Sequence, residues 1–188
     1  MSDAPTLALE ALLAAKRASL IETDYQAIPA ELRERPAWVC WQLELRRDKQ
    51  SGLWKVTKVP KRADSGGNAS STKPATWCAF EAALAGQERH NFDGIGFVFA
   101  DSDPYFGVDV DGCCNAATGE LAAPVAALVG RFATYAELSC SGTGVHLIGR
   151  GELPANKGRR IKGAVPGFEV ELYPRGRYFA MTGRKVTT

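Results

Sequence analysis

Apolar and polar residues alternate, or apolar residues form short runs, along most of the chain after residue 36. The segments AWVCWQLELRR (37–47) and LWKVTKV (53–59), separated by the turn-like DKQSG, predict a β-hairpin. The same pattern predicts further strands at 94–100, 105–112, 134–139, 145–149, 168–173 and 177–183. The short DSDP connection predicts that 94–100 and 105–112 pair antiparallel.

Helix-forming residues dominate three other segments. They predict a helix over 6–21, a helix over 77–86 that Thr76 caps and Gly86 ends, and a helix at about 120–132. Residues 60–75 and the basic stretch between 149 and 168 are predicted to be loops. Because most strands are joined by short connections, the pattern favours an α+β domain, a mainly antiparallel sheet flanked by helices.

The length of 188 residues, with 45% apolar and 23% charged residues, fits one globular domain. We expect residues 1–30 to form an N-terminal helical appendage or linker and residues 31–188 to form the functional domain. The chain ends directly after the last predicted strand, so we expect it to be a domain excised from a longer protein. The net charge of +2 does not by itself indicate a nucleic-acid partner.

No signal peptide and no apolar run of roughly 18 residues is present in the sequence, so we expect a cytoplasmic protein with no membrane association. The five cysteines show no CxxC spacing, and only two histidines could complement them. We therefore expect reduced, packed thiols and no zinc site.

Candidate chemistry begins with the stretch GVDVDGC, in which Asp109 and Asp111 alternate with Val108 and Val110. On a continuous strand the two carboxylates would share one face and the valines the other. Like charges on a partly buried strand are costly unless a cation lies between them, and carboxylate oxygens are ligands of Mg²⁺ or Mn²⁺. The alternative is a pair of surface acids on the solvated face of an edge strand.

A second candidate is SCSGTGVHLIGRG, in which a glycine-rich turn precedes a strand that carries His146. Backbone amides and hydroxyls around Ser141, Gly142 and Gly144 are suited to a phosphate group. The alternatives are an ordinary glycine hairpin and a core histidine with satisfied hydrogen bonds.

A third candidate is FEVELYPRGRYFAMTGR, where Glu169 and Glu171 share one face of a predicted strand and arginines, including Arg177, follow. These residues could supply a third carboxylate and a phosphate-binding guanidinium. The alternative is a solvated edge hairpin with weak ion pairs. Basic residues elsewhere could form a groove that follows a nucleic-acid backbone; they are Lys58, Lys61, Arg159, Arg160 and Lys162, the last three in the predicted basic loop.

The ordered set Asp-x-Asp, Ser-Gly-x-Gly-x-His and an acid followed by LY…GRYF…TG resembles the primase-polymerase catalytic domain of the archaeo-eukaryotic primase superfamily. The likeness is greatest to the versions in phages, plasmids and other mobile elements. RPAWVCW, KVPKR, TWCAFEAAL and FDGIGFVFADSDPYFGVDVDGC support it, and it spans about residues 35–184. It implies an α+β core with one half like an RNA-recognition motif, in the predicted domain 31–188.

The resemblance also implies DNA primase and DNA polymerase activity in replication, with two divalent ions, Mg²⁺ or Mn²⁺. By matching position, Asp109, Asp111 and Glu171 would be catalytic metal ligands, and Glu171 is preferred over Glu169 because it directly precedes LY. The incoming nucleotide triphosphate would be bound by Ser141, Gly142, Gly144, His146 and Arg177.

The implied partners are a DNA template and primer and dNTP or NTP substrates. A helicase or accessory domain is expected after this one in the full-length protein. Some relatives have a zinc-binding element, which the cysteine spacing here does not support. The alternative function is a catalytically inactive nucleic-acid-binding replication module.

Overall fold

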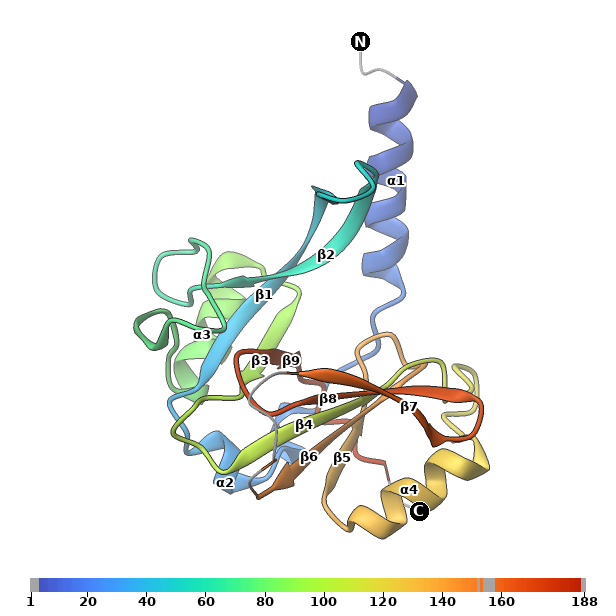
Figure 1. The fold of residues 1–188 in the computed structure, drawn as a ribbon. Helices are drawn as coiled ribbons and strands as arrows, with labels where there is room; N and C mark the ends of the chain where they lie inside the picture. The colour runs from blue at the N-terminus through green and yellow to red at the C-terminus, as the bar shows by residue number, and fades with distance from the viewer. Residues whose placement is uncertain (1–3, 152, 154–157, 187–188) are drawn as a thin grey trace.

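The computed structural model describes residues 4–151, 153 and 158–186 and shows an α+β domain with two antiparallel sheets (Figure 1). The four-stranded sheet has the order β2–β1–β3–β9 and consists of β1 (Trp38–Arg47), β2 (Trp54–Lys61), β3 (Gly94–Val98) and β9 (Tyr178–Ala180). The five-stranded sheet has the order β5–β6–β4–β8–β7 and consists of β4 (Tyr105–Val110), β5 (Tyr135–Leu138), β6 (Val145–Arg150), β7 (Arg159–Val165) and β8 (Phe168–Tyr173). The predicted fold class is confirmed.

The helical segments are α1 (Ala4–Ala18), η1 (Tyr25–Ala27), α2 (Ala30–Arg33), η2 (Pro74–Thr76), α3 (Phe80–His90) and α4 (Ala123–Phe132). Figure 1 shows α1 rising beside the long β1–β2 hairpin and α4 covering the five-stranded sheet. Leu13 packs with Trp41 and Leu43 of β1, and Arg17 forms an ion pair of 2.5 Å with Asp93, so these contacts hold α1 against the fold. No helix in the described ranges is both long and apolar enough to cross a bilayer.

The two faces of the five-stranded sheet have different partners. One face presents valines and leucines, such as Val108 and Leu147, to α4. The other face packs against the four-stranded sheet, and Ile148 of β6 and Phe97 of β3 lie in the same core cluster. Strand alternation therefore directs every second side chain of β4, β5, β6 and β8 into the space between the sheets.

Gly107 lets the two sheets approach each other. A Cβ at this position of β4 would lie 2.5 Å from the Phe179 ring and 2.6 Å from the Phe99 ring. Real carbon atoms do not approach so closely, so only glycine leaves room for Phe179 of β9 to pack on the five-stranded sheet.

The predicted pairing between 94–100 and 105–112 is wrong. The DSDP turn carries the chain from one sheet to the other, and β4 pairs with β6 and β8 instead. A strand has two edges, and those of β3 are taken by β1 and β9. Long-range pairing has outweighed the local signal of a short connection.

The predicted limits of the helix at 77–86 are also wrong. Thr76 lies in η2, where its hydroxyl accepts a hydrogen bond from the Ser70 amide at 3.0 Å and caps no α-helix. The helix begins later, as α3, and continues through Gly86 until Asn91 adopts a φ of 52°. Gly86 serves packing, since a Cβ there would lie 2.6 Å from Ala63.

Part of the predicted basic loop is a strand. Residues 159–165 form β7, which pairs with β8 and has an irregular register between Ile161 and Val165. An edge strand tolerates charged residues on its solvated side, which hides its periodicity in the sequence. Arg159 and Arg160 are exposed there, and Lys162 belongs to the same strand.

Candidate active site

The registers of the five-stranded sheet place five polar residues side by side, one from each strand. Glu137 of β5 lies opposite His146 of β6, and His146 lies opposite Asp109 of β4. Asp109 in turn lies opposite Glu171 of β8, which lies opposite Arg160 of β7. We call these five residues the charged row. They are on the face that is directed toward the four-stranded sheet.

Asp109 is the least compensated acid of the charged row. Its side chain is 20% exposed, and its Oδ1 atom is buried with no hydrogen-bond partner in the described part of the chain. Burial raises the pKa of this carboxyl, and the negative charges of Asp111 and Glu171 add to the rise, while His146 and Lys58 oppose it. A cation next to Asp109 would remove this penalty.

Asp111 lies beyond the strand on which it was predicted. β4 ends at Val110, and the chain then turns at Gly112, whose φ is 65°. Asp111 is exposed at the start of this turn. Its charge nevertheless contributes to the raised pKa of Asp109, so the two carboxylates remain electrostatically coupled.

Glu171, directly opposite Asp109, is the acid of β8 nearest to it along the sheet. Its carboxylate accepts hydrogen bonds from the Tyr173 hydroxyl and from Arg160 Nε, the latter at 2.6 Å. The bond from Tyr173, and then that from Arg160, lowers the pKa of Glu171. Glu169 has a side chain 48% exposed against 21% for Glu171. The preference for Glu171 as the third carboxylate stays a prediction.

The acids are only partly arranged as a metal site. Within the described residues, no three His, Cys, Asp or Glu side chains come close enough together to hold an ion. The unpartnered oxygen of Asp109 fits a divalent cation, whose preferred ligands are carboxylate oxygens. Glu171 is paired with Arg160, whose side chain is 65% exposed.

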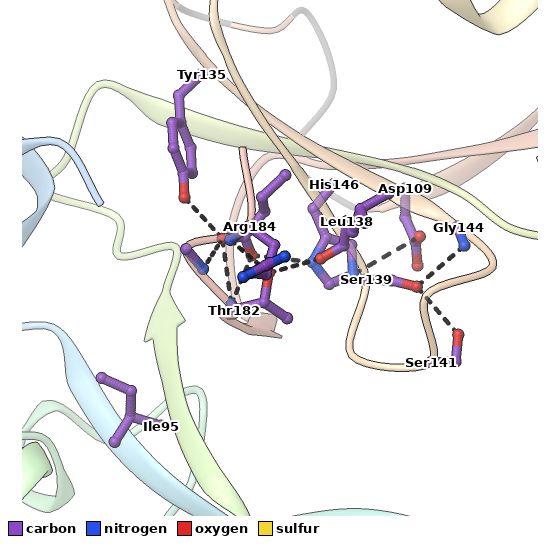
Figure 2. Close-up of polar contacts among 12 residues, drawn as sticks. Ile95, Asp109, Tyr135, Leu138, Ser139, Ser141, Gly144, His146, Thr182 and Arg184 are labelled. Atoms are coloured by element: carbon purple, nitrogen blue, oxygen red, sulfur yellow. Dashed lines mark hydrogen bonds and ion pairs between the residues drawn. The ribbon is translucent and has the colours of Figure 1, made fainter. Parts of the chain in front are cut away.

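His146 is held by contacts on three sides. Its ring stacks on Phe179 with centroids 4.3 Å apart and an interplanar angle of 18°. Its Nδ1 lies 3.5 Å from Glu137 Oε1. Its Nε2 lies 3.9 Å from Asp109 Oδ1 (Figure 2). The predicted candidate histidine therefore lies next to the predicted candidate aspartate, with an unpredicted glutamate behind it.

Glu137 was missed by the sequence reasoning, although a signal was present. It alternates with Tyr135 in TYAELS, a predicted strand that reaches the glycine turn before His146. A hairpin at that turn brings Glu137 and His146 into register. The acid was overlooked because a single glutamate in a short strand is usually exposed, whereas this one is completely buried.

The glycine turn is closed by its own hydrogen bonds. The Gly142 amide donates to the Ser139 carbonyl at 2.8 Å, and the Gly144 amide donates to Ser139 Oγ at 3.2 Å. Ser141 Oγ lies 2.9 Å from the Thr143 hydroxyl. These two amides are therefore already engaged, and a phosphate contact at Ser141, Gly142 and Gly144 stays a prediction.

A cleft of about 460 Å³ lies next to the charged row. Asp109 and His146 line it from the five-stranded sheet, Lys58 lines it from β2, and Arg177 lines it from the segment before β9. The Arg177 guanidinium lies 5.0 Å above the Tyr173 ring. Lys16 of α1 also lines it, so three cationic side chains share a cavity with the central carboxylate and the histidine.

The remaining basic candidates are dispersed. Lys61 Nζ forms an ion pair of 2.5 Å with Glu44 and also donates to Asn68. Arg160 pairs with both glutamates of β8, and Arg159 is exposed on β7. The side chain of Lys162 lies outside the described part of the structure. A continuous nucleic-acid groove through these residues stays a prediction.

Two antiparallel sheets with acids and a histidine on adjacent strands beside an open cleft are consistent with a primase-polymerase core. No protein-family model matches the chain. The chain is 34% identical over 146 residues to a protein named DNA primase-polymerase from Nitratiruptor phage NrS-1. It is thus homologous to a phage primase-polymerase, which confirms the resemblance drawn from the motifs. The match covers 78% of this chain and only 19% of the phage protein.

Proposed function

We propose that this chain is a catalytic primase-polymerase domain that performs template-directed nucleotidyl transfer in DNA replication. The observation that carries the proposal is the uncompensated Oδ1 of Asp109, flanked by His146 and Glu171 at the edge of a cleft that is lined by three cationic side chains. A purely structural row would leave no buried carboxylate oxygen unpaired.

The proposed metal ligands are Asp109, Asp111 and Glu171. When bound there, two Mg²⁺ or Mn²⁺ ions would activate the attacking hydroxyl and neutralise the charge of the leaving pyrophosphate. The ion pair between Arg160 and Glu171 must break before Glu171 can bind a metal ion. Because Arg160 is exposed, loss of this ion pair should cost little free energy. Tyr173 keeps the Glu171 carboxylate ionised through its hydrogen bond.

The proposed nucleotide site lies on the β6 side of Asp109, opposite to Glu171 of β8. His146 would contact the triphosphate through Nε2, the ring nitrogen on the side of Asp109, and Arg177 and Lys58 would add positive charge to the site. No side chain has to act as a nucleophile, because positioning and charge neutralisation are the main contributions to phosphoryl-type transfer. Ser141, Gly142 and Gly144 would complete the site after rearrangement of the turn.

Residues 31–188 are proposed as the catalytic domain, and residues 1–30 as an appendage through α1. DNA template, DNA primer and dNTP or NTP are the proposed partners. A helicase or accessory domain beyond this segment of the full-length protein remains part of the proposal.

Primer extension on a DNA template tests the proposal. The assay should be run with Mg²⁺ and with Mn²⁺, with dNTPs and NTPs in parallel, and with and without a primer. We expect extension by the wild type and none by the double variant Asp109→Ala/Asp111→Ala. Extension by that variant at the wild-type rate would refute the assignment of the acids.

A matched pair on β8 tests the third carboxylate. Glu171→Gln should abolish extension, whereas Glu169→Gln, an equally conservative change two residues away, should retain most of it. The reverse result would transfer the role to Glu169. If the wild type binds primer-template but incorporates no nucleotide with either metal, the inactive binding module is the correct function.

A further inference from the structure

Glu137 is a fully buried carboxylate surrounded by hydrogen-bond donors. The Thr182 amide lies 3.1 Å from Oε1 and 3.2 Å from Oε2, the Gly183 amide donates to Oε2 at 2.8 Å, and the Tyr135 hydroxyl donates to Oε2 at 2.8 Å. Among the described residues, Oε2 thus has three donors and Oε1 has one. A carboxylate oxygen can accept more than one hydrogen bond, so Oε1 has acceptor capacity left.

The remaining acceptor capacity of Oε1 is directed at His146. The Nδ1 atom of that ring lies 3.5 Å from Glu137 Oε1, is buried, and has no other hydrogen-bond partner within the described ranges of the chain. Stacking on Phe179 fixes the plane of the ring. A contraction of a few tenths of an ångström would turn this contact into a hydrogen bond from Nδ1–H to the carboxylate.

We propose that Glu137 is a positioning residue for His146: it accepts the Nδ1 hydrogen and so directs Nε2 toward the cleft. With Nδ1–H held in this way, any second proton on the ring resides on Nε2, where an anionic oxygen in the cleft can accept a hydrogen bond from it. The same carboxylate binds the amides of Thr182 and Gly183, which follow β9.

The orientation of the His146 ring by Glu137 follows from the contacts above alone. The effect of that orientation on catalysis rests on the proposed function of His146. The test therefore needs one readout without catalysis and one with it.

The first readout is the position of the ring hydrogens in ¹⁵N-histidine-labelled protein. The chain has only two histidines, so two sets of ring-nitrogen signals are expected, and His146→Gln assigns them. The wild-type spectrum should show a hydrogen on Nδ1 of His146. A ring that carries its only hydrogen on Nε2 would overturn the proposal, and this result does not depend on whether Glu137→Gln folds.

The second readout is the nucleotide KM in primer extension. Glu137→Gln should raise KM about ten-fold with a smaller change in kcat, at the low end of the losses seen when the partner that orients a metal-ligating histidine is removed. It should also shift the Nδ1 signal of His146. A folded Glu137→Gln protein with wild-type KM and a wild-type histidine spectrum would overturn the proposal.

A control separates positioning from general support of the C-terminal segment. Thr182→Ala removes the hydroxyl that donates to the Leu138 carbonyl at 2.7 Å, which loosens the same segment but leaves the Thr182 amide and Glu137 in place. It should lower Tm with little change in KM or in the His146 spectrum. An equal rise in KM for Thr182→Ala and Glu137→Gln would assign Glu137 a structural role only.

The triphosphate contact proposed for His146 and the positioning role proposed for Glu137 can be refuted separately. If His146→Gln has a wild-type KM, the proposed function of His146 is wrong, while the Nδ1 spectrum still decides its orientation. If His146→Gln raises KM and Glu137→Gln does not, the role of His146 stands and the positioning proposal is wrong.

Discussion

Glu137 and Asp109 are neighbours of the same histidine in the charged row, yet their environments are opposite. Glu137 is completely buried, and three hydrogen-bond donors of the protein, two amides and a hydroxyl, surround its carboxylate. Asp109 is partly exposed, and one of its oxygens is buried without a hydrogen-bond partner among the described residues. The protein compensates the charge of Glu137 from within, and under the proposed function a cation in the cleft compensates that of Asp109.

This difference separates two roles that look alike in sequence. Each acid stands between apolar residues on a strand, and each faces the space between the sheets. A satisfied buried carboxylate stabilises and orients what it contacts, because its charge is already balanced. An unsatisfied one lowers stability until a cation binds, which is typical of residues kept for function. Replacing Asp109 should therefore lower activity more than stability, and replacing Glu137 should lower stability more than activity.

The largest expected effect is on activity at Asp109. Asp109→Asn keeps the shape of the side chain but removes its charge, so extension should fall about a thousand-fold, as when a main electrostatic contribution to catalysis is lost. Because no compensated charge is removed, Tm in the absence of divalent ions should be equal to or above that of the wild type. Asp101→Asn, in the exposed DSDP turn, is the matched control and should leave extension unchanged.

A lower Tm in Asp109→Asn together with retained extension would contradict the contrast drawn between Asp109 and Glu137. It would mean that Asp109 is the structural acid of the row. Activity and thermal unfolding measured on the same preparation decide between these outcomes.

The next largest effect is on stability at Glu137. Glu137→Ala leaves the amides of Thr182 and Gly183 and the Tyr135 hydroxyl buried without an acceptor. We expect a loss of about 3 kcal/mol in the free energy of unfolding, measured by urea denaturation. Glu169→Ala on the solvated part of β8 should cost less than about 0.5 kcal/mol. Equal losses of unfolding free energy in Glu137→Ala and Glu169→Ala would show that the buried hydrogen bonds of Glu137 add no more stability than a solvated glutamate does.

The pH dependence of stability should also differ between the acids of the row. The raised pKa of Asp109 means that the folded protein holds a proton that the unfolded chain releases. Its contribution to stability is therefore greatest below the ordinary aspartate value of 3.8 and falls as pH rises through the native pKa. Glu171, whose pKa is lowered, behaves oppositely: its contribution is present above the ordinary glutamate value of 4.5 and is lost as pH falls through the native pKa.

Thermal unfolding in EDTA between about pH 2 and about pH 7 measures both contributions, since that of Glu171 changes below 4.5 and that of Asp109 changes above 3.8. Asp109→Asn should remove a decline of stability with rising pH, and Glu171→Gln should remove a rise. If both substitutions change the slope in the same direction, the two acids do not differ as the structure indicates.

The sequence predicted the fold class, the order of most strands and four of the residues beside the cleft, because these depend on local periodicity and short motifs. It did not predict that β3 and β4 lie in different sheets, that β7 exists, or that α3 begins at Phe80. These features depend on which strand edges are free and on close packing, as at Gly86 and Gly107. Glu137 was not identified from the sequence for the same reason, because its burial depends on how the two sheets pack together.

The smallest expected effect concerns Arg160, which lies at the open end of the charged row and pairs with Glu171. If a metal ion and Arg160 compete for that carboxylate, Arg160→Gln should lower the Mn²⁺ concentration for half-maximal extension. A two- to three-fold change is expected, since an exposed ion pair contributes only about 0.2–1 kcal/mol. Arg159→Gln, the neighbouring exposed arginine of β7, is the matched control for loss of positive charge. A higher metal requirement in Arg160→Gln alone would instead mean that Arg160 holds Glu171 in place for the ion, and that the open end of the row is preorganised like the buried end at Glu137.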